Sequence, residues 1–267
     1  MQRLFDSHSH SIYSPDGSDS IREMALRAST LGLVALAITD HCEANAYYSE
    51  GYDKRIADSV SDIFATKKLL DSDMELLCGI ELGQPLQGIS EAEQVVSQYS
   101  FDMVLGSLHN VDGLEDFAFL DYENLDLYDL LNKYYSEIYE MIKWGKFDSL
   151  AHLTYPLRYI RGVAKMDVDM ARFDEQIREI MELLVKQNIG LEINTSGLRQ
   201  HLQQAMPDLY YVKMFRECKG EILTLGSDAH RTADLAKGIA DAVEIAKAAG
   251  FKRVAYFKNR KPVFVEI

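Results

Sequence analysis

The chain alternates between short apolar runs and longer amphipathic segments. The short runs, rich in Val, Ile and Leu, predict buried strands at residues 4–7, 34–39, 76–81, 103–108, 149–152, 189–194 and 222–227. Apolar residues recur at helical spacing between the strands, and a capping box from Ser20 to Glu23 precedes the first of these stripes. The clearest stripes begin at Ile21, Leu127, Phe173 and Ala236.

This alternation of strands and helices predicts a parallel sheet. Seven strand–helix units follow one another without a linker rich in Pro, Gly or Ser, which indicates one closed or nearly closed barrel within a single domain spanning residues 1–267. We expect loop insertions at residues 84–98 and 112–129. The acidic segment 112–129 is expected to be solvated and to have no functional role.

Composition narrows the class of protein. The 267 residues are 47% hydrophobic with a formal net charge of −14, which argues against general electrostatic binding of nucleic acid. The cysteines Cys42, Cys78 and Cys218 are too widely spaced for a disulfide framework and fit a reducing compartment. Without a signal-like apolar run near Met1 or a stretch approaching ~20 apolar residues, we expect a cytoplasmic protein with no membrane partner.

Chemically reactive residues follow almost every predicted strand. His8 and His10 lie two apart, so in an extended chain they face the same side. The other residues at strand ends are Asp40, His41, Glu81, His109, His152, Asp228 and His230. Only His201 among the seven histidines lies elsewhere, and we assign it no role.

In a parallel barrel the carboxyl ends of all strands meet on one face. Carboxylates gathered there without cations would repel one another, and bound dications remove that penalty. The alternative, solvated histidines at separate strand ends, explains their common position poorly. Imidazole and carboxylate ligands without thiolate suit Zn, Mn, Fe or Co, and the residues suffice for two or three such metals. Glu81 is placed to bridge a pair, and Cys42 is not counted as a ligand.

Five motifs resemble those of the PHP (polymerase and histidinol phosphatase) superfamily. They are DSHSHSIYSPDG, ITDH, SLH, AH and GSDAH, and they run in order from residue 6 to residue 230. The resemblance implies a distorted (β/α)7 barrel with metals at the carboxyl ends of its strands.

The resemblance also implies three sets of metal ligands. The first is His8, His10, Glu81 and Asp228; the second is Glu81, His109 and His152; the third is Asp16, His41 and His230. Many relatives carry histidine at the position of Asp16. The alternative for Asp16 is an ordinary turn residue in Pro15-Asp16-Gly17.

Length and two further segments resemble the histidinol-phosphate phosphatase branch. LEINTSGLR places Arg199 after the sixth strand, and AHLTYPLRYIRG places Arg158 and Arg161 after the fifth. Guanidinium groups bind the terminal oxygens of a phosphate ester well. We expect Arg161 and Arg199, with Glu81, to act in catalysis, and Arg158 to be the weaker candidate for substrate binding. Surface arginines are the alternative, and the segment after His152 departs from the family pattern.

The implied reaction is metal-assisted hydrolysis of L-histidinol phosphate by a monomer or small homo-oligomer. Tyr13, Tyr47 and Tyr155 are candidates for the substrate pocket, and no general acid is identified. The alternatives are another PHP phosphoesterase, acting on a small phosphate, a phosphotyrosyl peptide or a phosphodiester; an amidohydrolase-type deaminase or esterase; and a non-catalytic metal module. A nuclease should have a basic groove, and the one basic run in the sequence is residues 258–261 near the C-terminus. Glu81 in the bridging position disfavours the amidohydrolase.

Overall fold

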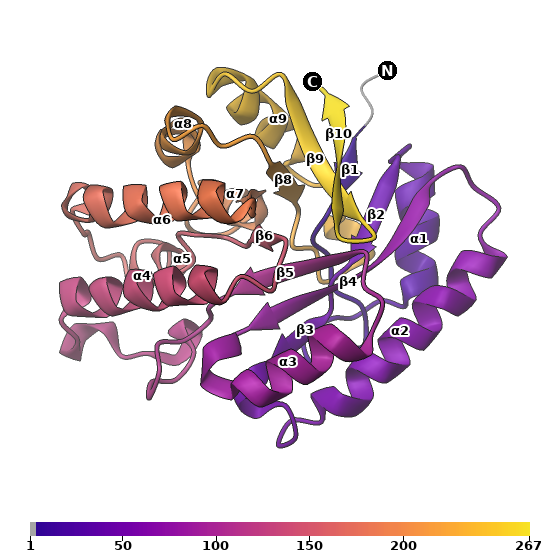
Figure 1. The fold of residues 1–267 in the computed structure, drawn as a ribbon, viewed down its shortest axis with the longest axis horizontal. Coiled ribbons are helices and arrows are strands. Elements are labelled where there is room, and N and C mark those ends of the chain that lie inside the picture. The colour runs from indigo at the N-terminus through magenta and orange to yellow at the C-terminus, as the bar shows by residue number, and fades with distance from the viewer. Residues whose placement is uncertain (1–3) are drawn as a thin grey trace.

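The computed structural model describes residues 4–267 and shows a curved parallel sheet surrounded by helices (Figure 1). The strands pair in the order β1-β2-β4-β5-β6-β7-β8, and β3 also pairs with β4. Their bounds are β1 (Phe5–Asp6), β2 (Ala35–Ile38), β3 (His41–Glu43), β4 (Glu75–Gly83), β5 (Met103–Ser107), β6 (Ser149–Leu150), β7 (Gly190–Asn194) and β8 (Leu223–Gly226). Each predicted strand is therefore present.

Backbone hydrogen bonds join the first and last strands and close the sheet. Ser7 N donates to Leu225 O at 2.9 Å, and Asp228 N donates to His8 O at 2.8 Å, just beyond the formal ends of β1 and β8. The two-residue strands β1 and β6 make the barrel irregular. These features confirm the predicted distorted (β/α)7 barrel.

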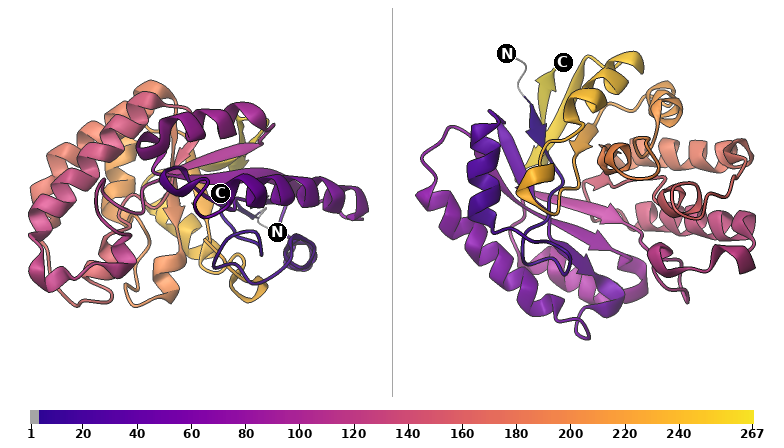
Figure 2. Two further views of the ribbon diagram at one scale, coloured as in Figure 1. Left: turned by 90° about the horizontal axis from the view of Figure 1, so that it is seen from below. Right: turned by 180° about the vertical axis from the view of Figure 1, so that it is seen from behind.

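Helices cover the outside of the barrel (Figures 1 and 2). They are α1 (Ile21–Thr30), α2 (Tyr52–Leu69), α3 (Ile89–Gln98), α4 (Leu127–Trp144), α5 (Leu157–Ile160), α6 (Asp174–Gln187), α7 (Ser196–Arg199), α8 (Leu209–Glu217) and α9 (Ile239–Ala248). The predicted capping box is present, since Ser20 and Glu23 exchange hydrogen bonds at the start of α1. Within residues 4–267, no helix is both long enough and apolar enough to cross a bilayer.

Burial follows the apolar pattern of the sequence. In β4 every residue after Glu75 is buried, because one side of the strand faces the barrel interior and the other faces the helices. In α4 the buried side chains form the expected stripe, which includes Leu127, Leu131 and Ile138.

Two segments differ from the expected arrangement. Residues 84–98 were expected to form a loop insertion but instead form a short 3-10 helix, Pro85–Gly88, followed by α3. The chain ends in an antiparallel hairpin, β9 (Arg253–Lys258) and β10 (Lys261–Glu266), which was not expected. Its turn residues Asn259 and Arg260 have φ of 50° and 61°, and without glycine they lack the usual hairpin signal.

Candidate metal centre

The carboxyl ends of the strands bring the predicted ligands together on one face of the barrel. Two of them have unusual backbone conformations: φ is 21° at His152 and 53° at Asp228. Such conformations cost roughly 1–3 kcal/mol each and persist where the surroundings hold them. His152 N donates to Glu192 Oε2 at 2.9 Å, and Asp228 N is held by His8 O, so both residues are fixed by neighbouring strands.

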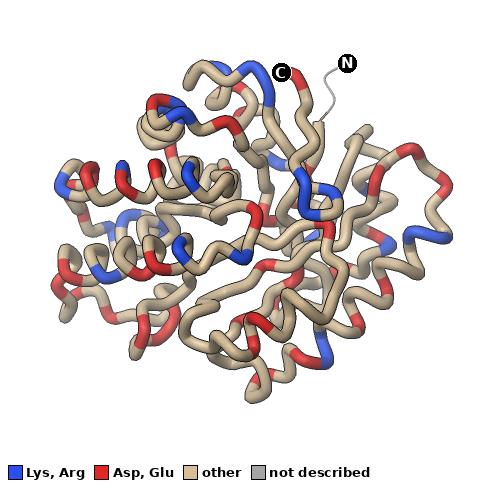
Figure 3. Tube along the Cα trace, viewed as in Figure 1, with Lys and Arg blue, Asp and Glu red and all other residues tan. Residues whose placement is uncertain are grey.

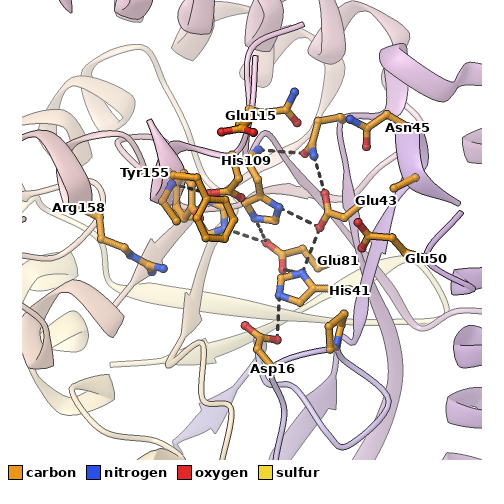
Figure 4. Close-up of a pocket in the computed structure, with 18 of the residues that line it drawn as sticks. Asp16, His41, Glu43, Asn45, Glu50, Glu81, His109, Glu115, Tyr155 and Arg158 are labelled. Atoms are coloured by element: carbon orange, nitrogen blue, oxygen red, sulfur yellow. Dashed lines mark hydrogen bonds and ion pairs between the residues drawn. The ribbon is translucent and has the colours of Figure 1, made fainter. Parts of the chain in front are cut away.

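Glu81 occupies the middle of the cluster (Figure 4). Its Oε1 lies 2.8 Å from His152 Nε2 and 3.2 Å from His109 Nε2. Its Oε2 lies 2.9 Å from His41 Nδ1 and 3.4 Å from His8 Nε2. The two carboxylate oxygens therefore face different groups of histidines, which is the arrangement of a bridging ligand.

Four histidines use Nδ1 for a hydrogen bond and turn Nε2 toward the centre. His8 Nδ1 donates to Glu192 Oε1 at 2.7 Å, and His109 Nδ1 donates to Glu43 Oε1 at 3.0 Å. His10 Nδ1 donates to Ser14 Oγ at 3.1 Å, and His230 Nδ1 donates to the carbonyl of Asp228 at 3.1 Å. These bonds place a proton on Nδ1 and orient each ring so that Nε2, once unprotonated, presents its lone pair to the centre of the cluster.

This tautomer pattern fits divalent metals. His8 Nε2 and His10 Nε2 lie 3.0 Å apart, a distance at which one ring nitrogen shares a proton with the other and at which a cation can take the place of that proton. His10 Nε2 also lies 3.4 Å from Asp228 Oδ1. His152 Nδ1 is buried and has no hydrogen-bond partner among the described residues, and Glu81 Oε2, which is also buried, meets only ring nitrogens of the cluster. Nitrogen and oxygen donors without thiolate are those expected of Zn, Mn, Fe or Co sites.

Asp16 lies at the exposed edge of the cluster. Its Oδ2 is 2.9 Å from His230 Nε2, and its Oδ1 is 3.6 Å from His41 Nε2. A Cβ at Gly17 would lie 1.8 Å from Ser11 O, so the turn that carries Asp16 packs too closely for any other residue. The structure therefore brings together Asp16, His41 and His230, the third expected set.

Opposite charges shift the pKa values of the central groups. Burial raises the pKa of Glu81, but the neighbouring His8 and His109 lower it further, so the net pKa lies well below its usual value. Burial lowers the pKa of His41 and His109, but Glu81 and Glu43 raise both well above the ordinary value. The site thus attracts cations strongly, whether protons or metal ions.

Three carboxylates around the cluster are absent from the ligand sets expected from sequence. Two of them were not predicted as site residues, and the third was named only as a strand-end residue. Glu192 bonds His8, and Glu43 bonds His109 and accepts from Gln84 Nε2 at 2.6 Å. Asp40, considered among the strand-end residues, instead accepts hydrogen bonds from Ser11, Ser14 and Ser59 and holds the first loop in place. The sequence contains a signal for two of them. Glu192 is a charged residue inside an apolar strand, GLEIN, and Glu43 lies two positions after the candidate ligand His41.

The arginines do not lie as expected. Arg158 lines the cavity above the cluster, donates to Asp228 Oδ2 at 2.9 Å and also bonds Ser196. Arg161 donates to Val168 O at 2.6 Å, and Arg199 donates to the carbonyls of Ser227 and Asp228 at 2.6 and 2.7 Å. Arg158 therefore lines the cavity, whereas the guanidinium groups of Arg161 and Arg199, the two arginines favoured from sequence, bond the backbone and do not line it.

The cavity has a volume of about 630 Å³ and its floor is the ligand cluster. Among the candidate tyrosines, Tyr155 lines it and Tyr13 and Tyr47 do not. The segment 112–129 was expected to be solvated and without a role, but its residues Leu114–Asp116 and Phe119 form part of the cavity wall. His201 lies with Arg199 at a separate surface hollow, away from the ligands.

Comparison with known proteins supports the family assignment. The PHP domain family matches residues 6–196. A probable histidinol-phosphatase from Thermotoga maritima is 32% identical over 253 residues, covering 94% of this chain and 95% of the relative. A histidinol-phosphatase from Lactococcus lactis is 26% identical, covering 98% of this chain and 96% of the relative.

Solved structures show the same fold. The Lactococcus lactis histidinol phosphate phosphatase, in complex with zinc, L-histidinol and phosphate, superposes with a TM-score of 0.78 at 22% identity, covering 98% of this chain and all of that one (100%). A putative histidinol phosphatase from Listeria monocytogenes gives a TM-score of 0.75 at 20% identity, covering 89% and 99%. With the family match and the relative from Thermotoga, these findings show that the chain belongs to the PHP domain family.

Proposed function

We propose that this chain is a metal-dependent phosphomonoesterase that hydrolyses L-histidinol phosphate to L-histidinol and phosphate, a reaction of histidine biosynthesis. The observation that carries the proposal is the cluster of histidines around Glu81 at the floor of a cavity whose wall includes Arg158. The relatives named histidinol-phosphatase, which match over nearly the full length of the chain, confirm the prediction of a phosphatase.

The ligand sets support binding of two or three divalent metals. His8, His10 and Asp228 form one compact group, and His41, Glu81 and His109 form a second. His10, His41 and His230 form a third, with Asp16 beside it. The nitrogen and oxygen donors suit Zn, Mn, Fe or Co, and zinc is the metal proposed among these because the Lactococcus lactis structure contains zinc.

When bound, the metals supply Lewis acidity and an activated water near neutral pH. The residues of the chain then hold the ester in place for attack. Arg158 is fixed by Asp228 and by the Tyr155 ring, whose centroid lies 4.9 Å from the guanidinium carbon. Both of the side-chain hydrogen bonds of Arg158, to Asp228 and Ser196, use Nη2, so a further N–H of this cavity-lining guanidinium group can bond a phosphate oxygen and stabilise the charge that develops on it. Burial lowers the pKa of Arg158 but the Asp228 charge raises it further, so the group stays cationic.

The charge distribution does not favour a nucleic-acid substrate. Figure 3 shows Lys and Arg interspersed with Asp and Glu along the chain, with a small basic group at the turn of the β9–β10 hairpin. Arg158 is the one Lys or Arg among the described residues that line the cavity. A phosphodiester backbone would need a continuous basic path.

The test is phosphate release from metal-quantified protein given L-histidinol phosphate, p-nitrophenyl phosphate and bis(p-nitrophenyl) phosphate. We expect kcat/KM of ~10⁴ M⁻¹s⁻¹ or more for L-histidinol phosphate, far above the values for the other esters. Equal rates on the two monoesters would overturn the proposed substrate. Faster release from the diester would overturn the assignment to monoesters.

A further inference from the structure

The cavity above the metal ligands has a basic side and an acidic side. Arg158 lies on one side of the cluster and Glu50 on the other (Figure 4), and Glu115 and Asp116 also line the cavity. A phosphate ester held by the metals and Arg158 therefore directs its organic part toward a wall that carries carboxylates.

Two of these carboxylates, Glu115 and Asp116, lie in residues 110–119, which we call the acidic wall and which follow His109 after the end of β5. Phe117 N donates to His109 O at 3.0 Å, and Asn110 Nδ2 donates to Leu114 O at 3.1 Å. The Phe117 side chain is fully buried, with its ring centroid 5.4 Å from that of Tyr134. These contacts give the segment a defined conformation next to a candidate metal ligand, in contrast to the solvated loop expected from its charge.

Asp116 is the carboxylate best placed to meet a cation. Ala118 N donates to its Oδ1 at 2.7 Å, and this is the one hydrogen bond that its carboxylate receives from the described residues. No Lys or Arg of residues 4–267 forms an ion pair with it. Burial raises the pKa of Asp116 and the nearby His109 lowers it, so the carboxylate is partly desolvated and lies close to the cluster. An ammonium group would supply the missing counter-charge.

We propose that Asp116, with Glu115 beside it, binds the ammonium group of the substrate and so selects phosphate monoesters that carry an amine near the ester oxygen. This inference rests on the proposed function, because it needs the phosphate to be held by the metals and Arg158. The segment that carries Asp116 is anchored to His109, so one small molecule reaches both the cluster and the carboxylate. Tyr155, whose ring centroid lies 5.0 Å from that of His109, forms the adjoining wall.

The test compares O-phosphoethanolamine, which carries the amine, with ethyl phosphate, which does not. Asp116→Asn keeps an acceptor for Ala118 N and removes only the charge. Glu123→Gln, an exposed change in the same part of the chain, is the matched control. We expect the wild-type protein to prefer the amine. Asp116→Asn should lose about 10- to 100-fold in kcat/KM on O-phosphoethanolamine, mainly through KM, and less than about 3-fold on ethyl phosphate.

Inhibition gives a second readout that does not depend on turnover of the amine substrate. Asp116→Asn should raise the inhibition constant of L-histidinol by a similar factor and leave that of inorganic phosphate unchanged. Equal losses on both esters, or a wild-type protein without preference for the amine, would overturn the inference. A wild-type protein that prefers O-phosphoethanolamine to ethyl phosphate, but gains nothing further with L-histidinol phosphate, would support the amine site and overturn the proposed substrate.

Discussion

Glu192 Oε1 lies 2.7 Å from His8 Nδ1, and both side chains are fully buried. The same carboxylate accepts from His152 N at 2.9 Å through its other oxygen, so one residue of β7 fixes two candidate ligands from different strands. Asn194 Nδ2 donates to it at 3.1 Å and keeps it in place. A carboxylate that holds the far nitrogen of a ligating histidine orients the ring and raises its basicity.

We therefore expect Glu192→Gln to weaken metal binding. Gln has nearly the same shape but no charge, and its single acceptor oxygen cannot accept from both His8 Nδ1 and His152 N, so one of these two residues loses its support. Metal affinity should fall about 10- to 100-fold, measured by competition with a chelator. Glu179→Gln, an exposed change on α6, serves as the control. Unchanged affinity in Glu192→Gln would show that Glu192 has only a packing role.

Arg158→Lys, compared with Arg161→Lys, tests which of these two arginines binds the phosphate. Lysine keeps the charge but cannot bond Asp228 and Ser196 while also directing a donor into the cavity. We expect kcat/KM to fall about 10- to 100-fold, whereas Arg161→Lys, which alters a bond to the Val168 carbonyl, should cost less than about 3-fold. A larger loss in Arg161→Lys than in Arg158→Lys would restore the expectation from sequence.

The ligand cluster could be predicted because its residues share a position that sequence reveals. His8, His41 and Glu81 each follow an apolar run, and the geometry of a parallel barrel brings such positions together without any knowledge of side-chain contacts. Glu192 could not be predicted in this way, because it lies inside a buried strand and its role depends on which neighbour it faces across the barrel. Strand pattern places a residue on a face but does not identify its partner there.

The arginines and the acidic wall could not be predicted for a related reason. Arg158 lies in the one-turn helix α5 and Arg161 is its C-terminal cap, so a small rotation decides which guanidinium group reaches the cavity. Residues 110–119 carry three acidic side chains and no basic one, and this charge alone is typical of a solvated loop. Their conformation depends on Phe117, which packs against Tyr134 of α4. Tertiary contacts of this kind leave no periodic signal in the sequence.

Asp16→Ala should remove one metal and leave the others. Asp16 is 60% exposed at its side chain and touches only the outer set through His230 and His41. We expect the bound metal, measured by native mass spectrometry, to fall by one equivalent per chain. The metals held by the ligand sets around Glu81 should be lost to a smaller extent. Asp71→Ala, at an exposed position before β4, is the control. Retention of every metal would mean that Asp16 is a turn residue, the alternative raised by Pro15 and Gly17.

Metal and protons compete for the same imidazoles, so we expect pH to change the stability of the metal-free protein more than that of the metal-loaded protein. The carboxylates Glu81 and Glu43 raise the pKa of His41 and His109 above the ordinary value of 6.5, although burial opposes the shift. In the metal-free protein these rings hold protons that the unfolded chain has lost, so their stabilising effect is full below about pH 6.5 and declines as pH rises through the raised pKa values. Burial lowers the pKa of His10 and His152, whose contributions change only below 6.5.

Bound metal requires unprotonated rings, so metal stabilises the fold more as pH rises. At a free metal concentration of about a thousand times Kd, the stabilisation is about 4 kcal/mol, or roughly 10 °C in Tm. We expect the Tm of chelator-treated protein to fall between pH 6.5 and 9 while that of the loaded protein holds, so that the difference widens. Differential scanning calorimetry with and without zinc measures both curves. A difference that stays constant with pH, or narrows as pH rises, would mean that His41 and His109 do not exchange protons for metal, and the assignment of these two rings as ligands would fail with it.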